Sequence, residues 1–269
     1  YNKDMFDKAG VAYPNENWTW DDLVAAAKKL TIDSNKDGII DQWGIILPRR
    51  PDFYFPIIYA NNGRVFKEND PDQILLTQPA AMEAMQYYAD IALKHHASPS
   101  HGQASDLDIA KGFHMGKIAM MISGWWDMVD TEKNAPNLKY DVAPLPKKKV
   151  RGTVNLATAT VMKKNTLHPK ETWEFIKFMT GTEGQLVRCK SGMAGPSRKS
   201  VANDPFFNDK KKEKVFIDGF EYGKGFYGNY TNLIMDEFGR AYERVLLGKQ
   251  SVEQAFKEAE KNYEKRKKS

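Results

Sequence analysis

A short apolar run that ends in a glycine, two tryptophans and an acid constrains this chain more than any other segment. It reads IAMMISGWWD at residues 118–127. An apolar run of this length is typical of a strand that is buried on both faces, as in a parallel sheet. Ligands of open α/β sheets bind beyond the carboxyl ends of the strands, where this strand would deliver two indoles and a carboxylate. Flat aromatic faces beside an acid suit a sugar, whereas the alternative is that both tryptophans belong to the core.

Composition limits the classes of protein to which the chain can belong. Its 269 residues, 41% hydrophobic and 28% charged, suffice for one large or two medium domains and exclude a disordered chain. No apolar run is long enough to cross a membrane. Part of the formal net charge of +5 lies in basic runs at residues 147–149, 210–212 and 265–268. These runs have no interleaved aromatic residues, so they indicate a solvated surface rather than a nucleic-acid site. Cys189 is the only cysteine, which excludes an intrachain disulfide.

Helix and strand signals alternate along the chain. Capping boxes, first-turn prolines and 3.6-residue apolar patterns predict helices at residues 20–30, 53–60, 77–92, 109–115, 170–180, 183–190, 232–247 and from 252 onward. Apolar and β-branched runs predict strands at residues 43–47, 118–123, 140–145 and 153–162. Few strands separated by helices indicate an α/β fold.

Short motifs spread over almost the whole chain carry a family resemblance. They are YNKDMFDKAGV at 1–11, WTWDDL at 18–23, AAAKKL at 25–30, ANNG at 60–63, GWW at 124–126, HP at 168–169, WEFI at 173–176 and GKQSVEQA at 248–255. Each motif is weak alone, but in this order they are specific. Together they resemble the extracellular solute-binding proteins of ABC transporters, in the sugar-binding branch that includes maltose-binding protein.

The resemblance implies a periplasmic binding protein-like type II fold, in which two α/β lobes joined by hinge crossovers close over a ligand. It assigns residues 1–149 and 201–269 to the C-terminal lobe and residues 151–200 to the N-terminal lobe. In the family, the motif at residues 1–4 lies well inside the protein. The resemblance therefore implies a truncated N-terminal lobe, with the lipoprotein signal of Gram-positive relatives in the missing part.

The match also implies which residues contact a ligand. The GWW motif and the acid after it give Trp126, Trp125 and Asp127. Cleft aromatics and amides of the family correspond to Phe53, Tyr54, Asn61 and Asn62. Further candidates are Asn155, Arg198, Tyr227 and Tyr230. The loop YGNY at 227–230 is aromatic and contains glycine, as at a cleft rim, although a packed interlobe loop would have the same composition.

A polar loop at residues 33–41, DSNKDGIID, has the oxygen spacing of an EF-hand. The first, third, fifth and ninth positions hold Asp33, Asn35, Asp37 and Asp41, and the backbone carbonyl would come from Ile39. The twelfth position is Gly44, so the usual bidentate glutamate is missing. The spacing predicts a structural Ca²⁺ ion, and the alternative is an Asx-rich turn without a metal.

Catalytic motifs are not found: the sequence has no nucleophile elbow, zincin motif or P-loop. We therefore expect a non-enzymatic, exported protein, periplasmic or lipid-anchored outside the membrane. It would capture a carbohydrate, in particular an oligosaccharide, and deliver it as a monomer to ABC permease subunits. One alternative is a carbohydrate-active enzyme with the same aromatic cleft, because a pair of catalytic carboxylates is a spatial feature. Another is a binding protein for a non-sugar solute.

Overall fold

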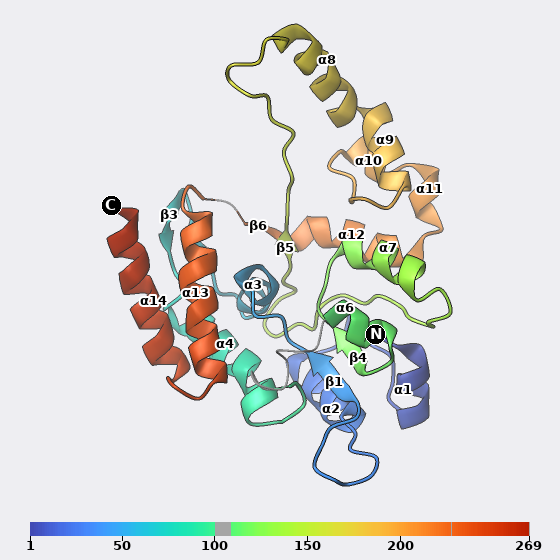
Figure 1. Ribbon diagram of the computed structural model, residues 1–269, viewed down its shortest axis with the longest axis vertical. Coiled ribbons are helices and arrows are strands. Elements are labelled where there is room, and N and C mark those ends of the chain that lie inside the picture. The colour runs from blue at the N-terminus through green and yellow to red at the C-terminus, as the bar shows by residue number, and fades with distance from the viewer. Residues whose placement is uncertain (100–108, 227, 269) are drawn as a thin grey trace.

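The computed structural model describes residues 1–99, 109–226 and 228–268, with helices predominating over short strands (Figure 1). The helices are α1 (Lys3–Ala9), α2 (Trp20–Leu30), α3 (Pro51–Ala60), α4 (Pro79–Leu93), α6 (Ile109–His114), α7 (Trp125–Asn134), α8 (Pro169–Thr180), α9 (Thr182–Lys190), α10 (Lys199–Ala202), α11 (Pro205–Asn208), α12 (Lys211–Tyr222), α13 (Thr231–Leu246) and α14 (Val252–Lys267). The strands are β1 (Trp43–Ile46), β2 (Phe66–Lys67), β3 (Asp70–Ile74), β4 (Ile118–Met121), β5 (Val154–Asn155) and β6 (Lys224–Gly225).

A parallel pair of buried strands, β1 and β4, supports the strand end that the sequence singled out. Ile45 lies opposite Met120 in this pair, which confirms the predicted parallel pairing. Helix α2 lies directly on β1, with no room for a side chain at Gly44. A Cβ atom there would be only 1.9 Å from the carbonyl oxygen of Ala27. The pair therefore fixes where β4 ends and where the following residues enter the cavity described below.

The main core lies where α3, α4, α13 and α14 pack together (Figure 1). Tyr54 of α3 stands at its centre, with ring centroids of Tyr88 and Tyr242 at 6.0 and 5.4 Å. Both predicted capping boxes are present, at the start of α2 and at the start of α14. The packing of these helices holds α3 in place, and α3 forms part of the cavity wall.

Two predicted strands are wrong or too long. Residues 140–145 form no strand, and only Tyr140 makes an isolated bridge, to Asn2. Pro144 and Pro146 lack the N–H groups that a continuing ladder needs. The strand predicted at 153–162 reduces to β5, which pairs in parallel with β6. The sequence reading also missed α1 and α12.

Residues 156–193 carry an unusual number of exposed apolar side chains. Figure 1 shows α8 far from the main body at the end of a long extended segment, and Ile176 is the buried residue of that helix. The exposed apolar side chains are Leu156, Val161, Met162, Leu167, Trp173, Phe175, Phe178, Val187 and Met193. Because α8 is apolar on several sides, it has the character of a helix that packs inside a larger unit.

A second buried cluster joins α9 to the rest of the molecule. Cys189 of α9 packs with Trp125 and Met128 of α7 and with Phe207 of α11. Residues assigned by the resemblance to two different lobes thus share one small core. Among the described residues, no helix is long and apolar enough to span a membrane.

Candidate functional site

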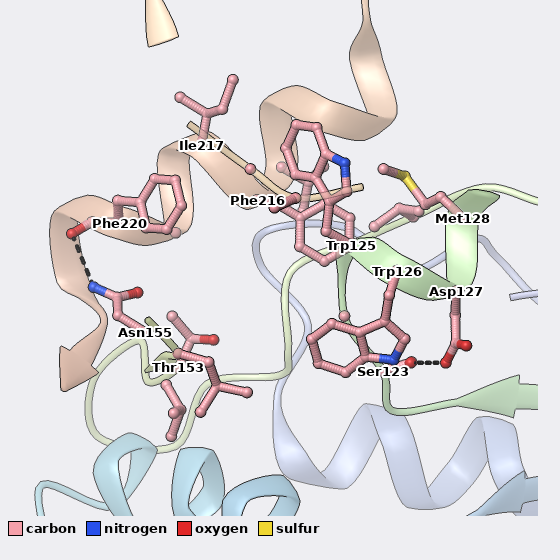
Figure 2. Close-up of a pocket in the computed structure, with 18 of the residues that line it drawn as sticks. Ser123, Trp125, Trp126, Asp127, Met128, Thr153, Asn155, Phe216, Ile217 and Phe220 are labelled. Atoms are coloured by element: carbon pink, nitrogen blue, oxygen red, sulfur yellow. Dashed lines mark hydrogen bonds between the residues drawn. The ribbon is translucent and has the colours of Figure 1, made fainter. Parts of the chain in front are cut away.

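A cavity of about 1120 Å³ opens where four parts of the chain meet (Figure 2). They are the end of β4, the first turn of α7, helix α12 and the segment at residues 149–155, which contains β5 and is called the crossover below. The end of β4 leads directly into the cavity, as the sequence predicted. Its volume is slightly above the range of about 300–1,000 Å³ that is usual for pockets that enclose small-molecule ligands.

Trp126 presents its indole to this cavity and is 46% exposed. Gly124, the N-cap residue of α7, makes this orientation possible. A Cβ atom at Gly124 would lie 2.3 Å from Cη2 of Trp126, so the indole rests directly on the backbone of the glycine. The ring of Phe53 from α3 meets Trp126 edge-on, with centroids 6.3 Å apart at 87°. The indole is thus held between two elements with part of its surface open.

Asp127 follows Trp126 in the first turn of α7 and also lines the cavity. The hydroxyl of Ser123 donates a hydrogen bond to Oδ2 of Asp127 (Figure 2). The N-terminal end of a helix also favours a negative charge. The carboxylate is therefore fixed beside the indole, with its other oxygen not engaged by Ser123. The sequence reading did not single out Ser123 as a site residue.

Trp125 points elsewhere, although it is the neighbour of Trp126. It is 7% exposed and packs against Phe207 and Phe216, with centroid distances of 6.2 and 5.7 Å. Successive residues of an α-helix point about 100° apart, so the two indoles cannot share one environment. Trp125 is largely buried and also lines the cavity, and a ligand contact at Trp125 stays a prediction.

The ligand contacts predicted in and just after helix α3 also differ in whether they reach the cavity. Phe53 lines the cavity, whereas Tyr54 is fully buried in the main core. Asn61 is also buried, and its Nδ2 donates to the carbonyl of Ala80 and to Oε2 of Glu83, both at 2.8 Å. Tyr54 and Asn61 therefore have structural roles in place of the predicted ligand contacts.

Asn62 lies in the exposed turn after α3, with φ of 59°. It is not part of the cavity wall. The ligand contact predicted for Asn62 is therefore not supported by its position, because the turn is where the chain leaves α3 and bends away.

The later candidates also differ among themselves. Asn155 lines the cavity and donates from Nδ2 to the carbonyl of Phe220 at 3.5 Å. Arg198 lines it too, with Nε donating to the carbonyl of Thr180. Tyr230 lies outside the cavity and packs edge-on against Tyr263. Tyr227 lies outside the described residues.

Several cavity residues were missed by the sequence reading. Phe216 and Phe220 come from α12, where their spacing of four residues on one helix face was a usable signal. Asp52 lines the cavity and forms an ion pair with Arg50 at 2.7 Å.

Burial raises the pKa of the Cys189 thiol, which keeps it protonated and unsuited to act as a nucleophile.

The loop at residues 33–41 lies apart from the cavity and is organised by its own hydrogen bonds. The backbone N–H of Gly38 donates to Oδ2 of Asp33 at 2.9 Å, and that of Ser34 donates to Oδ2 of Asp41 at 2.7 Å. Asp37 accepts from the backbone N–H of Ile39 at 2.8 Å. Within the described residues, no three acidic, histidine or cysteine side chains converge as metal ligands. One observation fits a cation: Oδ1 of Asp33 is buried without a hydrogen-bond partner.

Known proteins resemble this chain in sequence and in fold. A binding protein of Brucella abortus is 29% identical over 184 residues, 66% of this chain and 43% of the relative. The arabinooligosaccharide-binding protein of Bacillus subtilis is 26% identical over 249 residues, 90% of this chain and 55% of that protein. The chain thus spans about half the length of these curated relatives.

Among solved structures, an ABC substrate-binding protein from Listeria monocytogenes in complex with cycloalternan has a TM-score of 0.82 and 26% identity. The match covers 98% of this chain and 68% of that one. The predicted α/β fold of the periplasmic binding protein-like type II class is confirmed by this likeness. Residues 1–186 match the family described as bacterial extracellular solute-binding protein. With more than half of its length matched, the chain belongs to the bacterial extracellular solute-binding proteins.

Proposed function

We propose that the protein captures an oligosaccharide in this cavity for import by an ABC transporter. The observation that carries the proposal is the partly exposed indole of Trp126, fixed on Gly124 beside the carboxylate of Asp127. Support also comes from the relatives, since one is named for arabinooligosaccharides and another was solved with cycloalternan.

Each part of the site has a distinct task in this proposal. The apolar face of a sugar ring stacks on Trp126, and the edge-on ring of Phe53 keeps the indole from turning away. Asp127 accepts hydrogen bonds from sugar hydroxyls, while Ser123 holds the carboxylate in place. Such a pocket, mostly apolar with a few placed polar groups, gives orientation as well as affinity.

The family of binding proteins to which the chain belongs supports binding rather than hydrolysis. Glycosidases need two carboxyl groups that flank the bond, one acting as acid and one as base or nucleophile. Four carboxylates line the cavity, those of Asp52, Asp127, Asp141 and Glu221. Asp52 is paired with Arg50, and Asp127 accepts from Ser123. Incubating the protein with each oligosaccharide it binds, and analysing for shorter products, tests this; product formation would favour the enzyme.

Location and partners follow from the same proposal. The protein is exported and acts outside the cytoplasmic membrane, held there by a lipid anchor or kept in a periplasm. As a monomer, it delivers its ligand to the permease subunits of the transporter.

A thermal-shift screen tests the binding function. The full-length protein is melted with arabino-oligosaccharides, maltodextrins and cycloalternan, and with a peptide mixture and spermidine as non-sugar solutes. A ligand that binds the folded state alone raises the melting temperature, by an amount that grows with its concentration above Kd. We expect a shift with one class of oligosaccharide. Shifts with a non-sugar solute alone would contradict the proposal.

We also infer that residues 151–200 belong to a second lobe, in which further polypeptide of the same protein covers the apolar surface around α8. The exposed side chains of Trp173, Phe175 and Phe178 support this. We expect the chain of residues 1–269 alone to bind a hydrophobic fluorescent dye and the full-length protein to bind much less. Equal dye fluorescence from the two proteins would count against the second lobe.

For the loop at residues 33–41, we propose a structural Ca²⁺ ion. Asp33, Asn35, Asp37 and Asp41 would supply side-chain oxygens and Ile39 its carbonyl, and the partnerless Oδ1 of Asp33 supports the first of these. Calcium would neutralise the carboxylates and hold the loop closed. The same melting experiment, in excess Ca²⁺ or in EGTA, tests this. We expect a higher melting temperature with Ca²⁺, and equal values would argue for an Asx turn without a metal.

A further inference from the structure

A second aromatic ring faces the cavity from a helix that carries none of the recognised motifs. Phe220 of α12 is 42% exposed and lines the cavity. One helical turn earlier, Phe216 packs on Trp125. The two phenylalanines share one face of α12. Phe216 is partly buried against the cluster around Trp125, whereas Phe220 is more open on the cavity side.

The position of Phe220 is fixed by its neighbours. The carbonyl of Phe220 accepts the hydrogen bond from Asn155 in the crossover. Gly195 lies against the ring, since a Cβ atom there would be 3.4 Å from Cζ of Phe220 and 3.2 Å from Cε3 of Trp125. Asn155 is itself confined, because a Cβ atom at Gly223 would fall 2.1 Å from its Oδ1. The ring of Phe220 therefore stands beside Gly195, and the backbone that carries the ring is tied to Asn155.

Phe220 and Trp126 occupy different parts of one cavity. Figure 2 shows Phe220 with Asn155 on one side of the view and Trp126 with Ser123 and Asp127 on the other. The cavity that contains both rings has a volume of about 1120 Å³. A ligand that stacks on both rings has to reach from the Trp126 side of the cavity to the Phe220 side.

We propose that Phe220 is a second saccharide-stacking surface, which gives the site its preference for oligosaccharides over monosaccharides. The inference rests on the proposed function, because it extends the ligand that Trp126 holds. One sugar ring lies on Trp126, and a later ring of the same chain lies on Phe220. Asn155 is a positioning residue that ties the end of α12 to β5.

Calorimetry with a ladder of chain lengths tests this. Dissociation constants are measured for arabinose through arabinotetraose and for glucose through maltotetraose, with full-length wild-type protein and with Phe220→Ala. We expect Phe220→Ala to raise Kd about tenfold for the longest sugars that bind, because one aromatic contact is lost. The Kd for the shortest sugar that binds is expected to stay unchanged.

Two further variants separate stacking from general damage. Phe220→Tyr keeps the ring and is expected to retain wild-type affinities. Phe175→Ala removes a phenylalanine of α8 that does not line the cavity, and it should leave every Kd unchanged. If Phe220→Ala weakens all lengths equally or none, the second surface is disproved while the binding function stands. If the wild-type protein binds no sugar, the proposed function fails and takes this inference with it.

Discussion

Replacing Trp126 with alanine is expected to weaken oligosaccharide binding by about 30- to 1000-fold, the range that follows from losing 2–4 kcal/mol at an aromatic hot spot. Trp126 is 46% exposed whereas Trp125 is 7% exposed, so truncating Trp126 removes much less buried surface than truncating the core tryptophan. The melting temperature of the ligand-free Trp126→Ala variant should therefore fall far less than that of Trp125→Ala. Isothermal calorimetry with the best ligand from the thermal-shift screen measures the affinity, and a melting curve checks the fold.

Two other tryptophans provide matched controls for Trp126. Trp173 of α8 lies outside the cavity wall, so Trp173→Ala should leave affinity unchanged. Trp125→Ala removes a buried ring and is expected to destabilise the protein by about 3–5 kcal/mol. Wild-type affinity in Trp126→Ala would remove this residue from the binding site. A large loss of stability in Trp126→Ala would instead give it the role assigned to Trp125.

The elements that sequence analysis predicted well are those with strong local signals. The apolar run at 118–121 forms the buried parallel strand β4, and both capping boxes start helices where expected. The placement of Trp126 and Asp127 at the cavity follows from the strand end. These features depend on a few adjacent residues, so one sequence contains enough information to find them.

Individual side-chain directions could not be predicted in the same way. Trp125 and Trp126 are both large and aromatic, and the choice of which is buried depends on where α7 begins. The same holds for Phe53 and Tyr54 on α3, which face the cavity and the core respectively. A motif places a pair of neighbours at a site, but the phase of the helix decides which neighbour contacts it.

Other errors come from interactions distant in sequence. Residues 156–162 have the composition of a strand, but a strand forms only where another strand can pair with it, and β6 pairs only with residues 154 and 155. The sequence analysis missed Phe220 for two reasons. Helix α12 begins in a lysine-rich run. The cavity that Phe220 lines is formed by elements far apart in the chain. Pairing partners and cavities are properties of the folded chain.

The crossover that leads from the main body into the cavity wall is held against α3 at Gly152. A Cβ atom at this position would lie 2.3 Å from the backbone nitrogen of Ala60 and 2.6 Å from the carbonyl oxygen of Pro56. The backbone N–H groups of Lys149 and Val150 also donate to the carbonyl of Ala60, at 2.9 and 3.1 Å. Since α3 is packed in the main core, the crossover must move instead when a side chain is added.

Gly152→Ala is therefore expected to lower the free energy of unfolding by about 2–4 kcal/mol, through overpacking against backbone and strain on the two hydrogen bonds. Urea denaturation of the wild-type and variant proteins measures the change. Gly219→Ala in α12 is the matched control, because its Cβ atom would meet Cγ2 of Thr153 at an ordinary 3.6 Å. Alanine is also the better helix former there, so we expect no loss of stability. Equal unfolding midpoints for Gly152→Ala and the wild type would mean that the crossover is not held at α3.

The affinity of the same variant tells whether the contact at Gly152 also shapes the site. Thr153 and Asn155 follow Gly152 directly and line the cavity, and Asn155 bonds the end of α12 that carries Phe220. A displaced crossover should therefore disturb the Phe220 side of the cavity before the Trp126 side. We expect Gly152→Ala, measured well below its melting temperature, to weaken long oligosaccharides more than short ones. An equal loss at all lengths would mean that the displacement reaches Trp126 as well, and the two sides of the cavity would then move as one unit.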